Sequence, residues 1–258
     1  REEVVKMRHK MRDHLGGKSG EGEFDIGLST LTFLFEGSIM HRDTLGNVVE
    51  INPGAVNWMT AGKGIVHSER TPERLRHSAK VMHGLQIWVA LPKELEQMEP
   101  EFFHIEEKQI PQWTDGDLQF KLVAGEAFNK KSPVPVYSKL YMIEIKSKTR
   151  QTLNIGDQLY GESGLYILEG AIESDGNIYE PKQLLVAKDS TLCEFTIHEN
   201  STIYIFGGEP FPEKRYIDWN FVSSNKELIK EAKQKWEAQV FPKIEGDDTE
   251  YIPYPTRK

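Results

Sequence analysis

The chain has 258 residues, of which 38% are hydrophobic and 28% charged, and its formal net charge is −8. This composition is typical of a globular protein and excludes a collagen-like, coiled-coil or disordered chain. The negative charge argues against direct nucleic-acid binding, because a phosphate-binding surface needs clustered excess Lys and Arg. The single cysteine, Cys193, excludes an internal disulfide framework and any multi-cysteine zinc or iron–sulfur site.

The sequence also bears on cellular location. No uninterrupted apolar run approaches the roughly 20 residues that a membrane helix needs, and the N-terminus carries no signal-peptide segment. We therefore expect a cytoplasmic protein that does not bind membranes. The chain opens on Arg1 and not on Met, so we expect natural residues before it to be missing.

From residue 26 onward the sequence consists of short β-rich runs. Residues 26–35 are rich in Thr, Leu, Ile and Phe and predict a strand, and turn signals follow at 45–47, 52–54 and 61–64. Residues 85–91 place alternate apolar side chains on one face. Short strands at turn-limited intervals, without intervening helices, indicate a β-sandwich or β-barrel.

One short motif occurs in both halves of the chain. Residues 34–39 (LFEGSI) are echoed by residues 167–172 (ILEGAI), which indicates two similar β-domains. The Pro-Val-Pro at 133–135 is typical of a stiff linker. We therefore predict an N-terminal domain of residues 1–127 and a C-terminal domain of residues 128–258.

The C-terminal segment has a helical pattern. Ser224 and Glu227 have the spacing of a capping box at a helix start. A short C-terminal helix packed on the β-domains, followed by an extended tail, is predicted. Its apolar residues recur at helical intervals: Ile229, Ala232, Trp236 and Val240.

Residues 52–69 (NPGAVNWMTAGKGIVHSE) contain the strongest candidate for chemistry. On a strand, His67 and Glu69 point to one face. An imidazole and a carboxylate that project together into a barrel form half of a metal site. Spacing alone favours the alternative of a hydrogen-bonded His–Glu pair at a barrel rim, because such pairs are common.

Residues 52–69, followed by residues 83–92 (HGLQIWVALP), closely resemble the pirin family of the cupin superfamily. Residues 31–43 resemble that family's first core strand and hairpin. Residues 215–236, which contain WNFVSS, resemble the C-terminal segment of bacterial pirins. The resemblance covers about residues 13–255 and implies an all-β bicupin. Two antiparallel β-barrel (jelly-roll) domains would pack together, with a metal in the N-terminal barrel only.

The resemblance also implies four metal ligands. Two of them match His67 and Glu69 directly. The family's other two come from a His-Pro-His motif, and an ungapped alignment places Glu23 and Asp25 at those positions. One imidazole with three carboxylates would suit a hard cation such as Mn, Mg or Ca better than a redox-active iron centre, unless the metal has been lost.

A second explanation is that a short stretch carrying the histidines is absent between Asp25 and Ile26. We favour it, because deleting part of a barrel strand would remove backbone hydrogen-bond partners from its neighbours. The start at Arg1 supports it. Reading the gene across this junction distinguishes the two, since an uninterrupted codon pair would contradict the missing stretch.

The other candidate positions are weaker. His41, two residues before Asp43, is interpreted as a hydrogen-bonded rim histidine and not as a ligand. Aligning Gly170 with Gly37 gives the positions in the second half that correspond to the four predicted ligands. These positions hold residues that are not strong metal ligands, so we expect no second metal site: Gly156, Gln158, Asn200 and Thr202.

The resemblance implies a function. Some pirins show quercetin 2,3-dioxygenase activity, so we expect a small aromatic or flavonol-like substrate at Fe(II) or another divalent metal (Mn, Ni, Cu or Zn). A flavonol hydroxyl bound near the metal would have a lowered pKa, and Glu69 would take its proton. The alternative is a metal-dependent regulator that binds a protein partner without turnover. A metal-free homologue follows if Glu23 and Asp25 are the natural residues.

Overall fold

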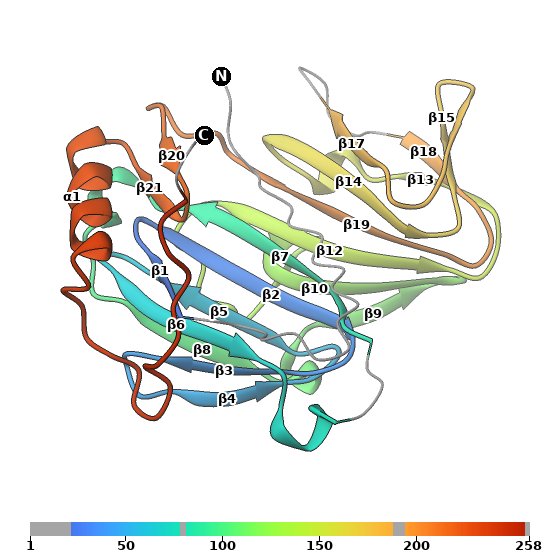
Figure 1. Cartoon of the computed structure of the whole chain (residues 1–258). Helices are drawn as coiled ribbons and strands as arrows, with labels where there is room; N and C mark the ends of the chain where they lie inside the picture. The colour runs from blue at the N-terminus through green and yellow to red at the C-terminus, as the bar shows by residue number, and fades with distance from the viewer. Residues whose placement is uncertain (1–21, 78–80, 188–193, 256–258) are drawn as a thin grey trace. The chain divides into compact units, whose positions relative to one another are not determined.

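The computed structural model describes residues 22–77, 81–187 and 194–255, so Cys193 lies outside the described residues (Figure 1). Within these ranges the chain consists mostly of antiparallel strands with one α-helix, as predicted for an all-β protein. No helix in the described part of the chain is long and apolar enough to cross a membrane.

The chain forms two compact units. Of the described residues, the first unit contains those up to Glu107 together with those from Pro212 onward, and the second contains those within Lys108–Phe211. Each unit holds antiparallel sheets, which confirms the prediction of two β-domains.

The first unit has two four-stranded sheets, in the orders β1-β6-β3-β4 and β7-β2-β5-β8, and a two-stranded hairpin, β20-β21. Its elements are β1 (Glu23–Asp25), β2 (Leu28–Glu36), β3 (Ile39–Asp43), β4 (Val48–Ile51), β5 (Val56–Thr60), β6 (Ile65–Arg70), η1 (Glu73–Leu75), β7 (His83–Ala90), η2 (Lys93–Leu95), β8 (Glu101–Ile105), β20 (Tyr216–Asp218), β21 (Phe221–Ser223) and α1 (Lys226–Glu237).

The second unit follows η3 (Glu107–Gln109) and has one larger sheet, β11-β10-β12-β19-β14-β17 with β9 paired to β10, and a smaller sheet, β13-β18-β15-β16. Its strands and its 3-10 helix are β9 (Gln112–Asp115), β10 (Leu118–Ala127), β11 (Lys130–Lys131), β12 (Leu140–Ser147), β13 (Gln151–Asn154), η4 (Gly156–Gln158), β14 (Glu162–Glu169), β15 (Ile172–Ser174), β16 (Asn177–Tyr179), β17 (Leu184–Ala187), β18 (Glu194–Ile197) and β19 (Ser201–Gly208).

The repeated Glu-Gly motif occupies the same structural position in both units. β2 ends at Glu36 and β14 ends at Glu169, and the register shifts just before each strand end. The following glycines, Gly37 and Gly170, have φ values of 85° and 74°, which only glycine adopts without strain. The sequence echo therefore marks a true structural repeat.

The division into units does not coincide with the predicted boundary at residues 127/128. Residues 118–127 form β10, which pairs with β12 along its length and so belongs to the second unit. Val134, in the expected linker, is buried in that unit. The C-terminal helix α1 (Figure 1) belongs to the first unit. There Trp236 stacks on Phe24, with ring centroids 6.0 Å apart.

Helix α1 confirms the predicted helix but begins one residue later than the capping box suggested. The N-cap is Asn225, whose side chain accepts a hydrogen bond from the Glu227 amide at 3.0 Å. The Ser224 hydroxyl is used elsewhere, since it donates to Glu96 at 3.2 Å. Val240 lies beyond the helix end and is exposed, so it takes no part in the buried face.

Candidate metal centre

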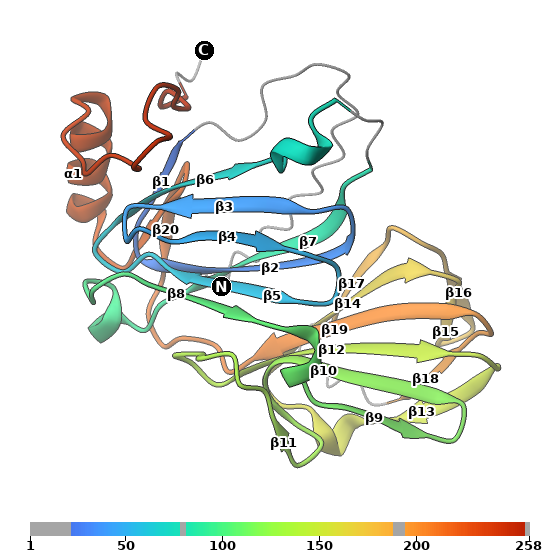
Figure 2. The same ribbon diagram turned by 90° about the horizontal axis from the view of Figure 1, so that it is seen from below.

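The polar residues of interest share one face of the β1-β6-β3-β4 sheet. His67 on β6 pairs with Glu23 of β1 on one side and with Asp43 of β3 on the other, while His41 pairs with Glu69. Directly paired residues of adjacent strands point to the same face. Figure 2 shows β6, β3 and β4 running side by side. The register therefore gathers His, Asp and Glu side chains on one surface.

This polar face is directed into the first unit. On the opposite face, Phe24 and Val66 pack in an apolar cluster with Trp236 of α1. On the polar face, Ile65 packs with Met59 from the second sheet. The two apolar contacts define the inside and the outside of the sheet, and they place His67 and Glu69 inside, as the alternation predicted.

Glu69 contacts the facing sheet. Gln86 Nε2 on β7 donates to Glu69 Oε1 at 3.0 Å and lies 3.2 Å from Oε2, and Thr32 Oγ1 on β2 donates to Oε1 at 3.4 Å. Sequence reasoning missed Gln86. Its signal was available, because Gln86 is the polar residue between the buried Leu85 and Ile87.

Two of the predicted ligands, His67 and Asp25, lie close to each other. His67 Nε2 lies 3.9 Å from Asp25 Oδ2, and the two residues are 5% and 1% exposed. Burying a carboxylate is costly unless it is paired, hydrogen-bonded or bound to a metal. Glu23 is half-buried on the same face, and its Oε2 accepts a hydrogen bond from Asn220 Nδ2 at 3.2 Å.

His41 contacts both Asp43 and the predicted ligand His67, whose ring centroid lies 5.9 Å from that of His41. His41 Nε2 lies 3.0 Å from Asp43 Oδ2, and its ring stacks on Phe102 with centroids 4.3 Å apart. Burial alone would raise the pKa of Asp43, but hydrogen bonds from His41 and Asn47 hold that pKa below its usual value. His41 is thus a hydrogen-bonded histidine, as expected, although it is buried and does not lie at a rim.

The predicted ligands have the chemistry that a divalent cation requires, and they lie on one face of the sheet. Imidazole and carboxylate are suitable ligands. The side-chain amides of Gln86 and Asn220 donate hydrogen bonds to Glu69 and Glu23, as in sites where such bonds orient metal-binding carboxylates. The donors do not surround a common point in this arrangement. Among the described residues, no group of three or more His, Cys, Asp or Glu is placed to hold a metal.

Strand β1 bears on the proposed missing stretch. Glu23, Phe24 and Asp25 pair with His67, Val66 and Ile65, so the β6 backbone has a partner there. The chain then turns at Gly27, where a Cβ atom would lie 1.9 Å from the Val222 carbonyl oxygen. The physical objection to natural carboxylates at these positions therefore does not apply to this structure, and the gene sequence is the remaining test.

The second unit has an apolar interior instead. Its β13-β18-β15-β16 sheet follows the same order as β1-β6-β3-β4. The positions that correspond to the predicted ligands are residues 156 and 158, which lie in η4, and residues 200 and 202. The strands equivalent to β1 and β6 are β13 and β18, and they contribute buried apolar residues. The absence of a metal from the second barrel stays a prediction. The buried residues of this sheet are Leu153, Ile172, Phe195 and Ile197.

Two family models match the chain. The model described as Pirin matches residues 3–89, and the model described as Pirin C-terminal cupin domain matches residues 141–242. A pirin-like protein of Caulobacter vibrioides is 45% identical over 231 residues, which are 89% of this chain and 79% of that protein.

Solved structures agree with these matches. A quercetin 2,3-dioxygenase from Acinetobacter baumannii has a TM-score of 0.82 at 30% identity, covering 92% of this chain and 79% of that one. A bacterial pirin from Escherichia coli, in complex with nickel(II), has a TM-score of 0.58 at 19% identity, covering 75% of this chain and 78% of that one. This more distant likeness concerns the fold alone.

Proposed function

The chain belongs to the pirin family, and on this premise we propose that it is a quercetin 2,3-dioxygenase-type enzyme. Its substrate would be a flavonol-like phenol bound inside the first unit at a single divalent metal ion. The observation that carries the proposal is the register of β1, β6 and β3, which gathers His, Asp and Glu side chains on the inner face. The relative named quercetin 2,3-dioxygenase supports the reaction class.

The residues that would hold the metal are His67, Glu69, Asp25 and Glu23. A set of one imidazole and three carboxylates favours a hard cation that accepts many oxygen ligands, such as Mn(II), over Cu(II). When bound, the metal would supply positive charge that lowers the pKa of a nearby substrate hydroxyl, and a redox centre for dioxygen.

We propose Glu69 as the residue that moves a proton. Its carboxylate is held by Gln86 and Thr32 from the facing sheet, so its orientation is fixed before a substrate arrives. We assign to Glu69 the uptake of the flavonol hydroxyl proton. Apolar side chains beside this face, Met59 and Phe102, would exclude water from the substrate ring.

The metal is tested by elemental analysis of the full-length protein and its His67→Ala variant after loading with Mn(II) or Fe(II). We expect near-stoichiometric metal in the parent protein and loss of most of it in the variant. His198→Ala, a histidine substitution in the second unit, serves as the matched control and should retain the metal. Equal metal in the parent and His67→Ala proteins would contradict the assignment.

The catalytic role is tested by Glu69→Gln. Loss of a general base typically lowers turnover by about 10²–10⁴-fold, and we expect a loss in that range for quercetin at metal concentrations that saturate the variant. A variant that keeps both metal and full turnover would refute the role. The parent protein could bind metal and yet turn over flavonol no faster than the free metal does. That result would favour the regulatory alternative. A protein partner and a cytoplasmic location both stay predictions.

A further inference from the structure

A pocket of about 600 Å³ opens at the surface of the first unit. Its lining comes from three stretches of the chain: residue 93 at the start of η2, residues 213, 214 and 216 around the start of β20, and residues 224–226 at the start of α1. None of the predicted metal ligands is among them. Small-molecule sites typically occupy roughly 300–1,000 Å³, so this pocket has the size of a site for a small organic ligand.

The lining of this pocket is basic. Among the described residues that line it, three are lysines, Lys93, Lys214 and Lys226, and only Glu213 is acidic. The chain as a whole has a formal net charge of −8. The three positive charges around one pocket therefore run against the charge balance of the molecule, and they favour an anion as the ligand.

These three lysines are not paired with carboxylates. No carboxylate oxygen in the described part of the chain lies within 4.0 Å of their ammonium groups. Exposed lysines elsewhere do have such partners, since Lys131 lies 2.7 Å from Glu126 and Lys243 lies 3.2 Å from Asp248. The lysines of the pocket therefore keep their charge available for a ligand.

Two of the ammonium groups share one aromatic ring. The Nζ atoms of Lys214 and Lys226 lie 5.6 Å and 4.7 Å from the centroid of the Tyr216 ring. Both distances are within the range of a cation–π contact, which attracts a cation to the ring without neutralising it. Two like charges gathered on one ring repel each other, and an anion bound beside them would offset that repulsion.

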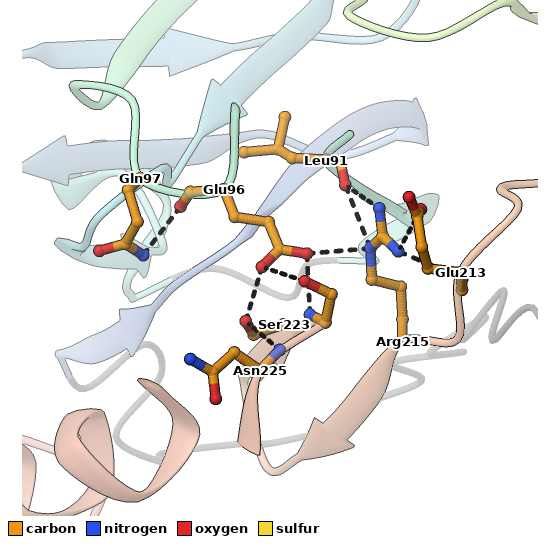
Figure 3. Close-up of polar contacts among 8 residues, drawn as sticks. Leu91, Glu96, Gln97, Glu213, Arg215, Ser223 and Asn225 are labelled. Atoms are coloured by element: carbon orange, nitrogen blue, oxygen red, sulfur yellow. Dashed lines mark hydrogen bonds and ion pairs between the residues drawn. The ribbon is translucent and has the colours of Figure 1, made fainter. Parts of the chain in front are cut away.

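The one acidic residue of the lining has a cationic partner of its own. Arg215 Nη1 lies 3.4 Å from Glu213 Oε2 and donates to the Glu213 carbonyl at 3.2 Å (Figure 3). The Arg215 side chain is only 8% exposed, and its Nε lies 3.0 Å from Glu96 Oε1. Arg215 and Glu96 together add no net charge, so the pocket keeps an excess of two positive charges.

The buried carboxylate of Glu96 also fixes one wall of the pocket. It accepts hydrogen bonds from Ser223 Oγ at 2.6 Å and from the Ser224 amide at 2.8 Å (Figure 3). Ser223 Oγ in turn accepts a hydrogen bond from the Asn225 amide at 3.0 Å. Ser224 and Asn225 line the pocket, so its wall is set before a ligand arrives, which lowers the entropic cost of binding.

We infer that this lysine pocket, formed by Lys93, Lys214 and Lys226, binds a small organic phosphate monoester. At pH 7 a phosphate monoester carries a charge of about −1.5 to −2 and has three strong acceptor oxygens. This charge matches the excess of two positive charges, and lysine binds phosphate as a point charge. A phosphate group fills only part of the pocket, and the polar residues Ser224 and Asn225 face the organic part. The inference does not depend on the metal centre.

The experiment measures binding to the full-length protein by titration calorimetry, after dialysis against a chelator so that no metal–phosphate complex contributes. The probes are inorganic phosphate, glucose 6-phosphate and adenosine 5′-monophosphate, and glucose is the unphosphorylated control. We expect at least one of the two esters to bind at one site per chain, more tightly than inorganic phosphate. We expect glucose not to bind.

The test variant combines Lys93→Gln, Lys214→Gln and Lys226→Gln. We expect it to weaken binding of the ester at least about 10-fold, because each charge-assisted contact to the phosphate is lost. All three side chains are exposed, so the variant should keep the unfolding midpoint of the parent protein.

The matched control variant combines Lys230→Gln, Lys233→Gln and Lys243→Gln. It removes the same number of charges from the same unit, outside the pocket. It should bind the ester as tightly as the parent protein does.

Three results would overturn the inference. In the first, neither ester binds the parent protein more tightly than inorganic phosphate. In the second, the lysine-pocket variant binds the ester as tightly as the parent. In the third, both triple variants lose affinity equally, which would mean that only the overall charge matters. None of these results bears on the metal centre, which the His67→Ala variant tests separately.

Discussion

The carboxylate of Glu69 accepts hydrogen bonds from strands of the facing sheet, although it extends from β6. Alternation along β6 predicted the face on which Glu69 lies, since side chains two residues apart project together. Its partners were not predictable in the same way. Gln86 and Thr32 lie 17 and 37 residues away along the chain, and only the packing of one sheet over the other brings them within 3.4 Å.

For single residues we predict that Gln86→Leu weakens Mn²⁺ binding roughly 10-fold, because Glu69 loses the amide that orients its carboxylate. The measurement is a calorimetric titration of the full-length protein. Gln151→Leu makes the same substitution in the second unit, where Gln151 donates to Ser147, and should leave the affinity unchanged. Unchanged affinity in Gln86→Leu would show that Glu69 does not need this partner.

At the scale of elements, the segment after α1 is bound to β6 through Asp247. The Asp247 carboxylate accepts hydrogen bonds from Ser68 Oγ and Arg70 Nε, both at 2.7 Å. Burial alone would raise the pKa of Asp247, but the hydrogen bonds from Arg70 and Ser68 outweigh it and lower that pKa. The strand that carries His67 and Glu69 is therefore held from its outer side by a residue near the end of the chain.

This contact predicts a pH dependence. Because the pKa of Asp247 is lower in the folded state than the value of about 3.9 expected when unfolded, ionised Asp247 stabilises the fold above that value. The contribution is lost as the pH falls through the folded-state pKa. We expect Asp247→Asn to lower the free energy of unfolding by about 2 kcal/mol at pH 7, and by progressively less below about pH 4.

The measurement is urea unfolding of the parent and Asp247→Asn proteins at several pH values between 7 and 3. Asp248→Asn is the matched control, because Asp248 pairs with the exposed Lys243 at 3.2 Å, and the substitution should change stability by less than about 0.5 kcal/mol. A difference between parent and Asp247→Asn that stays constant across this pH range would contradict the ionic origin of the contact.

At the scale of the whole molecule, the chain leaves the first unit at residue 107 and returns to it at residue 212. The returning segment covers the outer face of β1 and β6, where Phe24 and Val66 pack against Ile229 and Trp236. Without that cover these side chains would face water. The N-terminal cupin-like unit is therefore completed by residues from the opposite end of the sequence.

We predict that Trp236→Ala destabilises the first unit by about 3–5 kcal/mol, the range for removing a buried large aromatic side chain. The substitution also removes the hydrogen bond from Trp236 Nε1 to the Ile252 carbonyl. Amide hydrogen exchange should become faster in β1 and β6. Lys235→Ala, at the exposed neighbouring position, is the control and should leave exchange unchanged. If the β1 and β6 amides stay as protected in Trp236→Ala as in the parent, the helix does not act as a cover.

The sequence by itself determined the local features of this protein. Period-two alternation predicted the strands and the shared face of His67 and Glu69, and helical spacing predicted α1. The Glu-Gly echo predicted the two similar domains. These features depend on residues close in sequence, whose relative directions are set by the backbone period alone.

Only the tertiary structure decided which distant residues meet. Strand register placed Glu23 and Asp43 beside His67, and the return of the chain placed Asn220 on Glu23 and moved α1 from the expected second domain to the first. No local pattern encodes such contacts, because they form only when separate apolar faces are buried together. That burial depends on the sum of many side chains across the fold.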